Sequence, residues 1–327
     1  MTDQALPTYD DILAAAVRIE GEAVRTPLVT SPALDAKLNA RVFLKPECLQ
    51  RTGSFKFRGA FNAVSQIPAD RRANGVVACS SGNHAQGVAA AAALHGMPAT
   101  IVMPSDAPAI KRERTEGYGA TVVSYDRSSQ DRDALTEAIA AEKGATLVHP
   151  YDNRDVIAGQ GTIGLEIVED LRTRGLTPDV VLVCCGGGGL TAGVALAIKT
   201  LVPSAAIYPV EPEGFDDQAR SFAAGERLRN TRTAGSVCDA LLTPMPGVLS
   251  FALNKPRIAR GLVVSDAEAL AAVGYAAREL KLVLEPGGAV ALAAALSGKV
   301  DLSGKIVAIV LSGGNVDPAI LAGAVAA

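Results

Sequence analysis

The sequence lacks tryptophan, and only 4% of its 327 residues are aromatic. Its core must therefore consist mainly of Ala, Val, Leu and Ile. An excess of positive charge is also missing, because the net charge is -3 at pH 7, so we expect no nucleic-acid partner. A hydrophobic content of 49% with 20% charged residues is typical of an ordinary globular protein.

Targeting and membrane segments are missing as well. The longest apolar stretch, Val88 to Met103, is interrupted by His95, Gly96 and Pro98. We therefore expect no signal peptide, no membrane contact and a cytoplasmic location. The cysteines have no metal-type spacing, which predicts buried, reduced thiols. They are Cys48, Cys79, Cys184, Cys185 and Cys238.

Strands alternate with helices along most of the chain, which predicts an α/β protein with parallel sheets covered on both faces. The block near Val76 to Pro150 has this pattern and can form a small α/β domain of its own. The region Phe215 to Arg260 is poorly periodic and is expected to contain functional loops. A helix near Ile12 is expected to be capped by Asp10 or Asp11.

A single lysine, Lys56, stands between Phe55 and Phe57 at the start of a helical pattern. Loss of water and the positive end of a helix dipole both favour the neutral amine, so the pKa of this lysine should fall. Such an amine suits a nucleophile, a base or a Schiff base. The alternative is a surface lysine whose stem packs on the two rings.

Three polar loops follow strands, at the edge where parallel sheets bind ligands. They are Ser80 to His84, Gly186 to Gly189, and Ser312 to Asn315. Four consecutive glycines before a helix can close their N–H groups around a phosphate, although a tight turn is the alternative. The loop matches neither a P-loop nor a GxGxxG fingerprint. A Schiff-base lysine together with a phosphate loop indicates pyridoxal 5'-phosphate (PLP).

These loops and the Lys56 segment resemble, in order and over nearly the whole chain, the fold-type II PLP enzymes of the serine/threonine dehydratase and serine racemase family, including 3-hydroxyaspartate dehydratases. The resemblance implies two open parallel-sheet α/β domains, similar to tryptophan synthase β, with PLP in the cleft between them. Residues 1–70 and 151–327 would form the large PLP-binding domain, and residues 71–150 a small mobile domain. It also implies a homodimer.

The same resemblance assigns the PLP contacts. Lys56 would form the Schiff base, with Phe55 against the cofactor ring and Asn83 on the ring hydroxyl. The phosphate would be held by Gly186, Gly187, Gly188 and Gly189, and Ser312 would face the pyridine nitrogen.

On the substrate side, the resemblance implies that the carboxylate is held by Ser80, Ser81, Gly82 and His84. Lys56 would remove the Cα proton, and loss of water would give an enamine, then a 2-oxo acid and ammonia. The implied enzyme is a PLP-dependent ammonia-lyase for 3-hydroxyaspartate or for L-threonine and L-serine. Ser81 matches the second acid/base of the racemase branch, so a serine or aspartate-type racemase is the alternative.

Three further features bear on metal and substrate. Glu211, Asp217 and the carbonyl of Phe215 resemble the family's site for Mg²⁺, Ca²⁺ or Mn²⁺, whereas spacing alone favours a solvated acidic loop. Arg132 stands where the racemase branch presents an arginine, which would pair with the distal carboxylate of 3-hydroxyaspartate. Its alternative is a solvated, mixed-charge helix start.

Two departures from the family pattern, Ala240 in place of glycine and Tyr151 in place of asparagine, put simple threonine or serine specificity in doubt. The lack of a regulatory extension after the last strand points to amino acid catabolism. A non-catalytic sensor would not need Lys56, and a nucleotide-binding protein would not need the Phe55-Lys56 pair. Sulfhydrylases and β-synthases of the same fold type are nearer rivals.

Overall fold

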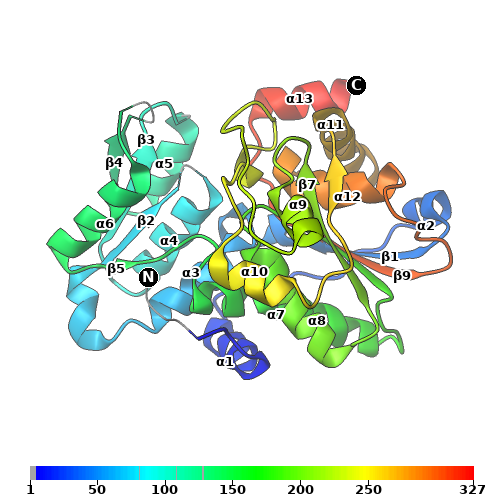
Figure 1. The fold of residues 1–327 in the computed structure, drawn as a ribbon, viewed down its shortest axis with the longest axis horizontal. Helices are drawn as coiled ribbons and strands as arrows, with labels where there is room; N and C mark the ends of the chain where they lie inside the picture. Colours follow the sequence, from blue (N-terminus) through cyan, green and yellow to red (C-terminus); the bar gives the residue numbers. More distant parts are fainter. Residues whose placement is uncertain (1–4, 81, 108, 127–128) are drawn as a thin grey trace.

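The computed structural model describes residues 5–80, 82–107, 109–126 and 129–327, which form two parallel sheets (Figure 1). The larger sheet has five strands in the order β1-β9-β6-β7-β8. Their bounds are β1 Arg41–Pro46, β9 Ile306–Leu311, β6 Val180–Cys184, β7 Ala206–Pro212 and β8 Leu262–Val264. All neighbours in this sheet pair in parallel.

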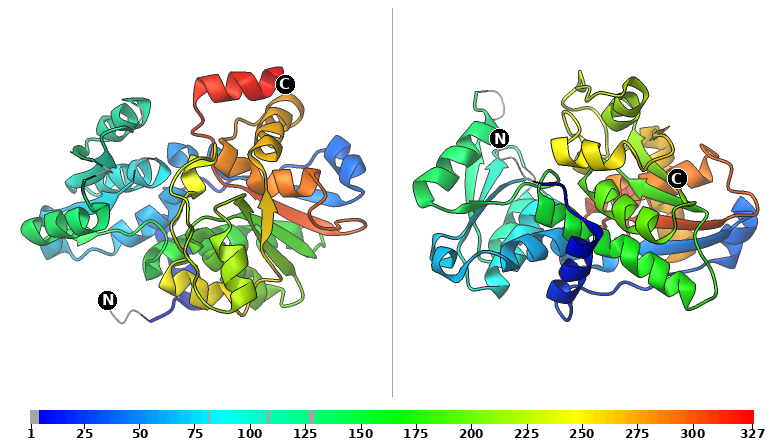
Figure 2. Two further views of the ribbon diagram at one scale, coloured as in Figure 1. Left: turned by 45° about the horizontal axis from the view of Figure 1, so that its top comes forward. Right: turned by 60° about the horizontal axis from the view of Figure 1, so that its bottom comes forward.

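The smaller sheet has four parallel strands in the order β4-β3-β2-β5. They are β4 Thr121–Tyr125, β3 Ala99–Pro104, β2 Val76–Cys79 and β5 Thr146–Leu147. All four lie between residues 71 and 150, the range predicted for the small domain. Figure 2 shows this sheet beside the rest of the chain from two further directions.

Helices cover both faces of each sheet, as the alternating pattern predicts. Those before β6 are α1 Tyr9–Ile19, α2 Pro32–Leu38, α3 Lys56–Ser65, α4 Asn83–Leu94, α5 Ala109–Gly117, α6 Arg132–Lys143 and α7 Arg154–Arg172. Those after it are α8 Gly189–Leu201, α9 Asp217–Ala224, α10 Val248–Asn254, α11 Asp266–Tyr275, α12 Pro286–Leu296 and α13 Pro318–Ala326. Short turns of other helix types are η1 Glu47–Leu49, η2 Arg51–Gly53, η3 Ala69–Asn74, η4 Asp239–Leu241 and η5 Ala276–Leu280.

The core of the five-stranded sheet follows the period of two along its strands. Leu182 of β6 packs with α11 and α12 on one face, and its neighbours Val181 and Val183 pack with α7 and α8 on the other. Because successive side chains of a strand point to opposite faces, one apolar run fills both layers. The sheet is thereby covered by helices on both faces.

Helix α3 lies where the two sheets meet. Its residues Phe57, Phe61 and Val64 belong to the apolar core beneath β2 and β3. The predicted boundaries assign this helix to the large domain, and in the structure it packs on both α4 and α7 and shares an apolar core with β2 and β3. Just before α3, Ser54 forms a β-bridge with Gly313, at the end of β9. The start of α3 therefore contacts both sheets.

Several local expectations need correction. The cap of α1 is Thr8, whose hydroxyl accepts the Asp11 N–H, while the Asp11 carboxylate accepts the Thr8 N–H at 2.7 Å. The region 215–260 contains α9 and α10, which have eight and seven residues and are too short to give a clear helical period. Among the cysteines, Cys48 and Cys79 are half-buried, because one lies in a turn and the other lines a cavity. No described helix is both long and apolar enough to cross a membrane.

Candidate active site

A cavity of about 360 Å³ lies at the carboxyl ends of the strands, with lining residues from both sheets. All three loops that the sequence singled out meet there. Ser80, Gly82 and His84 follow β2, the four glycines follow β6, and Ser312 follows β9. The rule that open parallel sheets bind ligands at this edge therefore located the cavity.

Lys56, the first residue of α3, reaches into this cavity instead of lying on the outer surface. Its Nζ donates a hydrogen bond to the Pro150 carbonyl at 2.7 Å and lies 5.1 Å from the centre of the Phe55 ring. Removal from water lowers its pKa from 10.5 to about 8, and the charge of Glu285 opposes this change. Because a pKa near 8 leaves a sizeable neutral fraction at physiological pH, the amine is available as a nucleophile and base.

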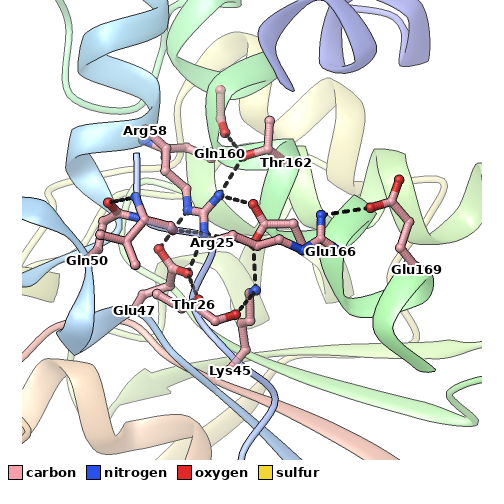
Figure 3. A network of polar contacts seen from close by, with 12 residues as sticks. Arg25, Thr26, Lys45, Glu47, Gln50, Arg58, Gln160, Thr162, Glu166 and Glu169 are labelled. Carbon is pink, nitrogen blue, oxygen red and sulfur yellow. Dashed lines mark hydrogen bonds and ion pairs between the residues drawn. The ribbon is translucent and has the colours of Figure 1, made fainter. Parts of the chain in front are cut away.

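A buried ionic cluster fixes the helix that carries Lys56 (Figure 3). The Arg58 guanidinium pairs with Glu47 at 2.8 Å and with Glu166 of α7 at 2.6 Å. Glu166 also pairs with Lys45 of β1 at 2.5 Å. Two positive and two negative groups balance inside the protein, so burial leaves no net charge. The cluster ties α3 to β1 and α7 two residues after Lys56.

The loop Gly186–Gly189 joins β6 to α8, and its glycines are needed for space as well as conformation. A Cβ on Gly187 would overlap the Tyr151 ring, and one on Gly189 would lie 2.6 Å from the Tyr151 carbonyl oxygen. Gly188 has a φ of +91°, which side-chain-bearing residues rarely adopt. The loop ends at the N-terminus of α8, where the helix dipole favours an anion. A phosphate fits this cradle, and the nearby amine fits an aldehyde.

Asn83 and Ser312 lie on the cavity wall. The Asn83 amide donates to Glu285 at 2.6 Å and accepts from Asn315 at 2.7 Å. Burial raises the pKa of Glu285 to about 7, and its hydrogen bond from Asn83 works against this. Sequence reasoning missed Glu285, since a lone carboxylate before a Pro-Gly-Gly helix start carries no motif. The Ser312 carbonyl accepts the Phe55 N–H at 3.1 Å, which places Lys56 opposite the end of β9.

The loop after β2 was predicted to bind the substrate carboxylate. The Ser80 hydroxyl accepts the Gly82 N–H at 3.1 Å, while Ser81 lies outside the described residues. His84 Nε2 lies 2.8 Å from the Val148 carbonyl, so this nitrogen carries the proton and Nδ1 is an acceptor. Within the described structure, Nδ1 is buried without a hydrogen-bond partner. Burial, followed by the charge of Lys56, lowers the pKa of His84 to about 3, so the ring is neutral.

Arg132, the first residue of α6, lines the cavity, although 42% of its side chain is exposed. Its Nε lies 3.3 Å from Asp133. Arg132 thus borders both the cavity and the solvent. Lys111 of α5 forms an ion pair with Asp239 of η4 on the cavity wall, and this contact between the two sheets was not foreseen.

The residues of the predicted metal site are buried, which overturns the solvated-loop alternative. Both Glu211 oxygens accept backbone N–H groups, from Gln218 at 2.9 Å and Ala219 at 2.8 Å. One Asp217 oxygen accepts from Asn230 at 2.6 Å, and the other has no partner among the described residues. Burial raises the pKa of both carboxyls, for Asp217 to about 7. No cluster of three or more metal-binding side chains occurs in the described ranges, and this set has only two carboxylates.

An amine and a glycine loop at a helix N-terminus, in a cavity between two parallel sheets covered by helices, define a PLP enzyme of fold type II. Comparison with known proteins agrees. The family described as pyridoxal-phosphate dependent enzyme matches residues 19–313, and the chain belongs to this family.

Relatives of known activity match nearly full length. An L-threo-3-hydroxyaspartate ammonia-lyase from a Pseudomonas species is 47% identical, over 95% of this chain and 96% of its own. The serine racemase of Schizosaccharomyces pombe is 41% identical, over 95% of both chains. The solved structure of maize serine racemase has a TM-score of 0.91 and 37% identity, covering 98% of this chain and 97% of its own. The predicted family and fold class are confirmed.

Proposed function

We propose that this protein is a PLP-dependent ammonia-lyase that removes water from 3-hydroxyaspartate, with L-threonine and L-serine as poorer substrates. The observation that carries the proposal is the lowered pKa of Lys56 inside a cavity that also contains the phosphate cradle. The Pseudomonas relative is named for this reaction on the L-threo isomer. When bound, PLP supplies an electron sink that stabilises negative charge at Cα.

Lys56 is the proposed base that takes the Cα proton. Its hydrogen bond to the Pro150 carbonyl holds Nζ in the cavity, and its pKa of about 8 allows it to accept and return a proton near neutral pH. The neutral His84 donates its only N–H to the Val148 carbonyl, so its side chain has no N–H left for the substrate carboxylate. That carboxylate is assigned to the loop Ser80–His84, because α4 begins there at Asn83 and its dipole favours an anion.

Arg132 is the proposed ligand of the distal carboxylate. It is the arginine at the cavity wall beside Tyr151, and a guanidinium binds a carboxylate through two parallel hydrogen bonds. Threonine and serine have no such group, so Arg132 favours hydroxyaspartate over both.

Glu211, Asp217 and the Phe215 carbonyl are the proposed ligands of a Mg²⁺ ion. Support comes from two neighbouring buried carboxyls and from the Asp217 oxygen without a partner, because a cation would offset the cost of burying negative charge. A homodimer, which the family resemblance implies, and a cytoplasmic location, which the sequence leads us to expect, are further parts of the proposal.

The test measures release of 2-oxo acid and ammonia from L-threo-3-hydroxyaspartate, L-threonine and L-serine by PLP-loaded protein. We expect the highest kcat/KM for hydroxyaspartate and no turnover by Lys56→Ala. Arg132→Ala should raise KM for hydroxyaspartate at least tenfold, as loss of a charged pair would, and leave serine turnover nearly unchanged. Arg71→Ala, which removes an exposed arginine outside the cavity, is the matched control. Equal losses for both substrates would exclude Arg132 as a distal-carboxylate ligand, and no turnover of any substrate would refute the lyase proposal.

A racemase is the second candidate, because two close relatives are serine racemases. The proposed second acid/base is Ser81, on which the described structure is silent. Chiral chromatography of L-serine and L-aspartate reactions separates the candidates. D-isomer formation that exceeds 2-oxo acid formation, and that is lost in Ser81→Ala, would replace the lyase assignment.

A further inference from the structure

Three buried side chains donate hydrogen bonds to the carbonyl groups of the glycine loop. Gln218 Nε2 donates to the Gly186 carbonyl at 3.1 Å, and Ser250 Oγ donates to the Gly187 carbonyl at 2.6 Å. Asn254 Nδ2 donates to the Gly188 carbonyl at 3.1 Å. Gln218 belongs to α9, whereas the other two belong to α10. Three consecutive carbonyls are thus held from the same side of the loop.

This arrangement decides where the N–H groups point. In a trans peptide the C=O of one residue and the N–H of the next point in opposite directions, and no described peptide bond is cis. Carbonyls held toward α9 and α10 therefore turn the N–H groups of Gly187, Gly188 and Gly189 the other way, into the cavity that these glycines line. Consecutive N–H groups aimed at one point form an anion site.

The three side chains also converge on one atom position. A Cβ on Gly188 would lie 2.5 Å from Gln218 Nε2, 3.0 Å from Ser250 Oγ and 3.1 Å from Asn254 Nδ2. The orientation of the two amides is unambiguous, because the opposite orientation would set oxygen against a carbonyl oxygen. All three residues are fully buried.

We propose that Gln218, Ser250 and Asn254 are positioning residues that aim the glycine-loop N–H groups at the cofactor phosphate. They do not touch the cofactor, but act through the loop carbonyls. The inference rests on the use of PLP in the proposed function and does not depend on the substrate. It also gives a role to α9 and α10, the two short helices of the irregular region 215–260.

Packing of the fold is the competing role, and a second observation separates it from positioning. Gln218 Oε1 and Asn254 Oδ1 are buried without hydrogen-bond partners among the described residues. A buried, unpaired oxygen opposes folding, so amides kept only for packing would be poor choices. Apolar replacements of similar size remove the unpaired oxygen as well as the donor. Gln218→Met and Asn254→Leu should therefore fold, with thermal stability close to that of the wild type.

The test compares PLP with pyridoxal, which has the same aldehyde and ring but lacks the phosphate. Both are titrated into apoprotein, and the absorbance of the imine with Lys56 reports binding. The variants are Gln218→Met, Ser250→Ala and Asn254→Leu. The matched control is Ser221→Ala, a buried serine of α9 whose hydroxyl accepts the Leu228 N–H and does not contact the glycine loop. Melting temperatures of the apoproteins are measured in parallel.

Each variant should weaken PLP binding about fivefold to tenfold, as loss of one positioned hydrogen bond predicts. Pyridoxal binding should change less than twofold. The effect of Gln218→Met should be the largest, because the Gly187 carbonyl also accepts the Gly247 N–H at 3.1 Å and the Gly188 carbonyl also accepts the Ala192 N–H at 2.8 Å. Ser221→Ala should leave both affinities unchanged.

Two results would overturn the inference. Equal weakening of PLP and pyridoxal would mean that the side chains only support the fold, and an unchanged PLP affinity in all three variants would mean that the loop needs no support from behind. The proposed function fails separately, since it requires that the wild-type protein bind PLP more tightly than pyridoxal and form an imine at Lys56.

Discussion

The pKa of Lys56 gives the sharpest quantitative prediction. At pH 7 a lysine with the usual pKa of 10.5 is about 0.03% neutral, whereas one with a pKa of about 8 is about 9% neutral. The reactivity of Lys56 toward an electrophile at pH 7 should therefore exceed that of an ordinary lysine of equal access by about 300-fold. The physical cause is loss of water around Nζ, which is only partly offset by Glu285.

Competitive labelling measures this value directly. Apoprotein is treated with trace acetic anhydride between pH 6 and pH 11, and the Lys56 peptide is quantified by mass spectrometry against the peptide of exposed Lys37. Labelling of Lys56 should level off above a midpoint near pH 8. In Glu285→Gln the midpoint should move lower, since the carboxylate charge that favours the ammonium is removed. Labelling that still rises tenfold per pH unit between pH 9 and pH 10 would refute the reasoning.

Three further predictions concern the surroundings of Lys56. Glu166→Gln should lower the free energy of unfolding by about 3–5 kcal/mol in urea titrations, because Arg58 and Lys45 would keep a buried positive charge without its partner. An unchanged midpoint would contradict a structural role for the cluster. Gly187→Ala should abolish PLP binding through its clash with the Tyr151 ring, while Gly323→Ala, where a Cβ meets open space, should have no effect. Mg²⁺ should raise the melting temperature of the wild type and not of Asp217→Asn; an equal rise in both would exclude a cation at that carboxylate.

The strand-and-loop pattern was predictable, because apolar runs of four to six residues followed by glycine or serine mark the strand ends. This pattern located β2, β6 and β9 and the loops that meet at the cavity. The helices α9 and α10 were not predictable, since seven or eight residues among prolines and glycines give no clear period. The helical pattern at Lys56 predicted α3, and Lys56 is the first residue of that helix.

The site residues also divide into those that a local sequence pattern predicts and those that it does not. Lys56 and the glycine loop were predictable because their chemistry depends on neighbours in the sequence. Glu285 and the pair Lys111–Asp239 were not, because their partners lie 202 and 128 residues away along the chain. Contacts of that kind depend on how two sheets meet, and no local pattern carries this information.

The cavity residues come from two separate sheets, and this has a consequence for redesign of the substrate specificity. The glycine loop and Ser312 extend from the five-stranded sheet, while the loop 80–84 and Arg132 extend from elements around the four-stranded sheet. Apart from Lys56, whose helix contacts both sheets, and Asn83, which begins α4, the groups assigned to the cofactor and those assigned to the substrate thus occupy different structural units. A library that varies only the groups assigned to the substrate can test new amino acid substrates while the groups assigned to the cofactor stay unchanged.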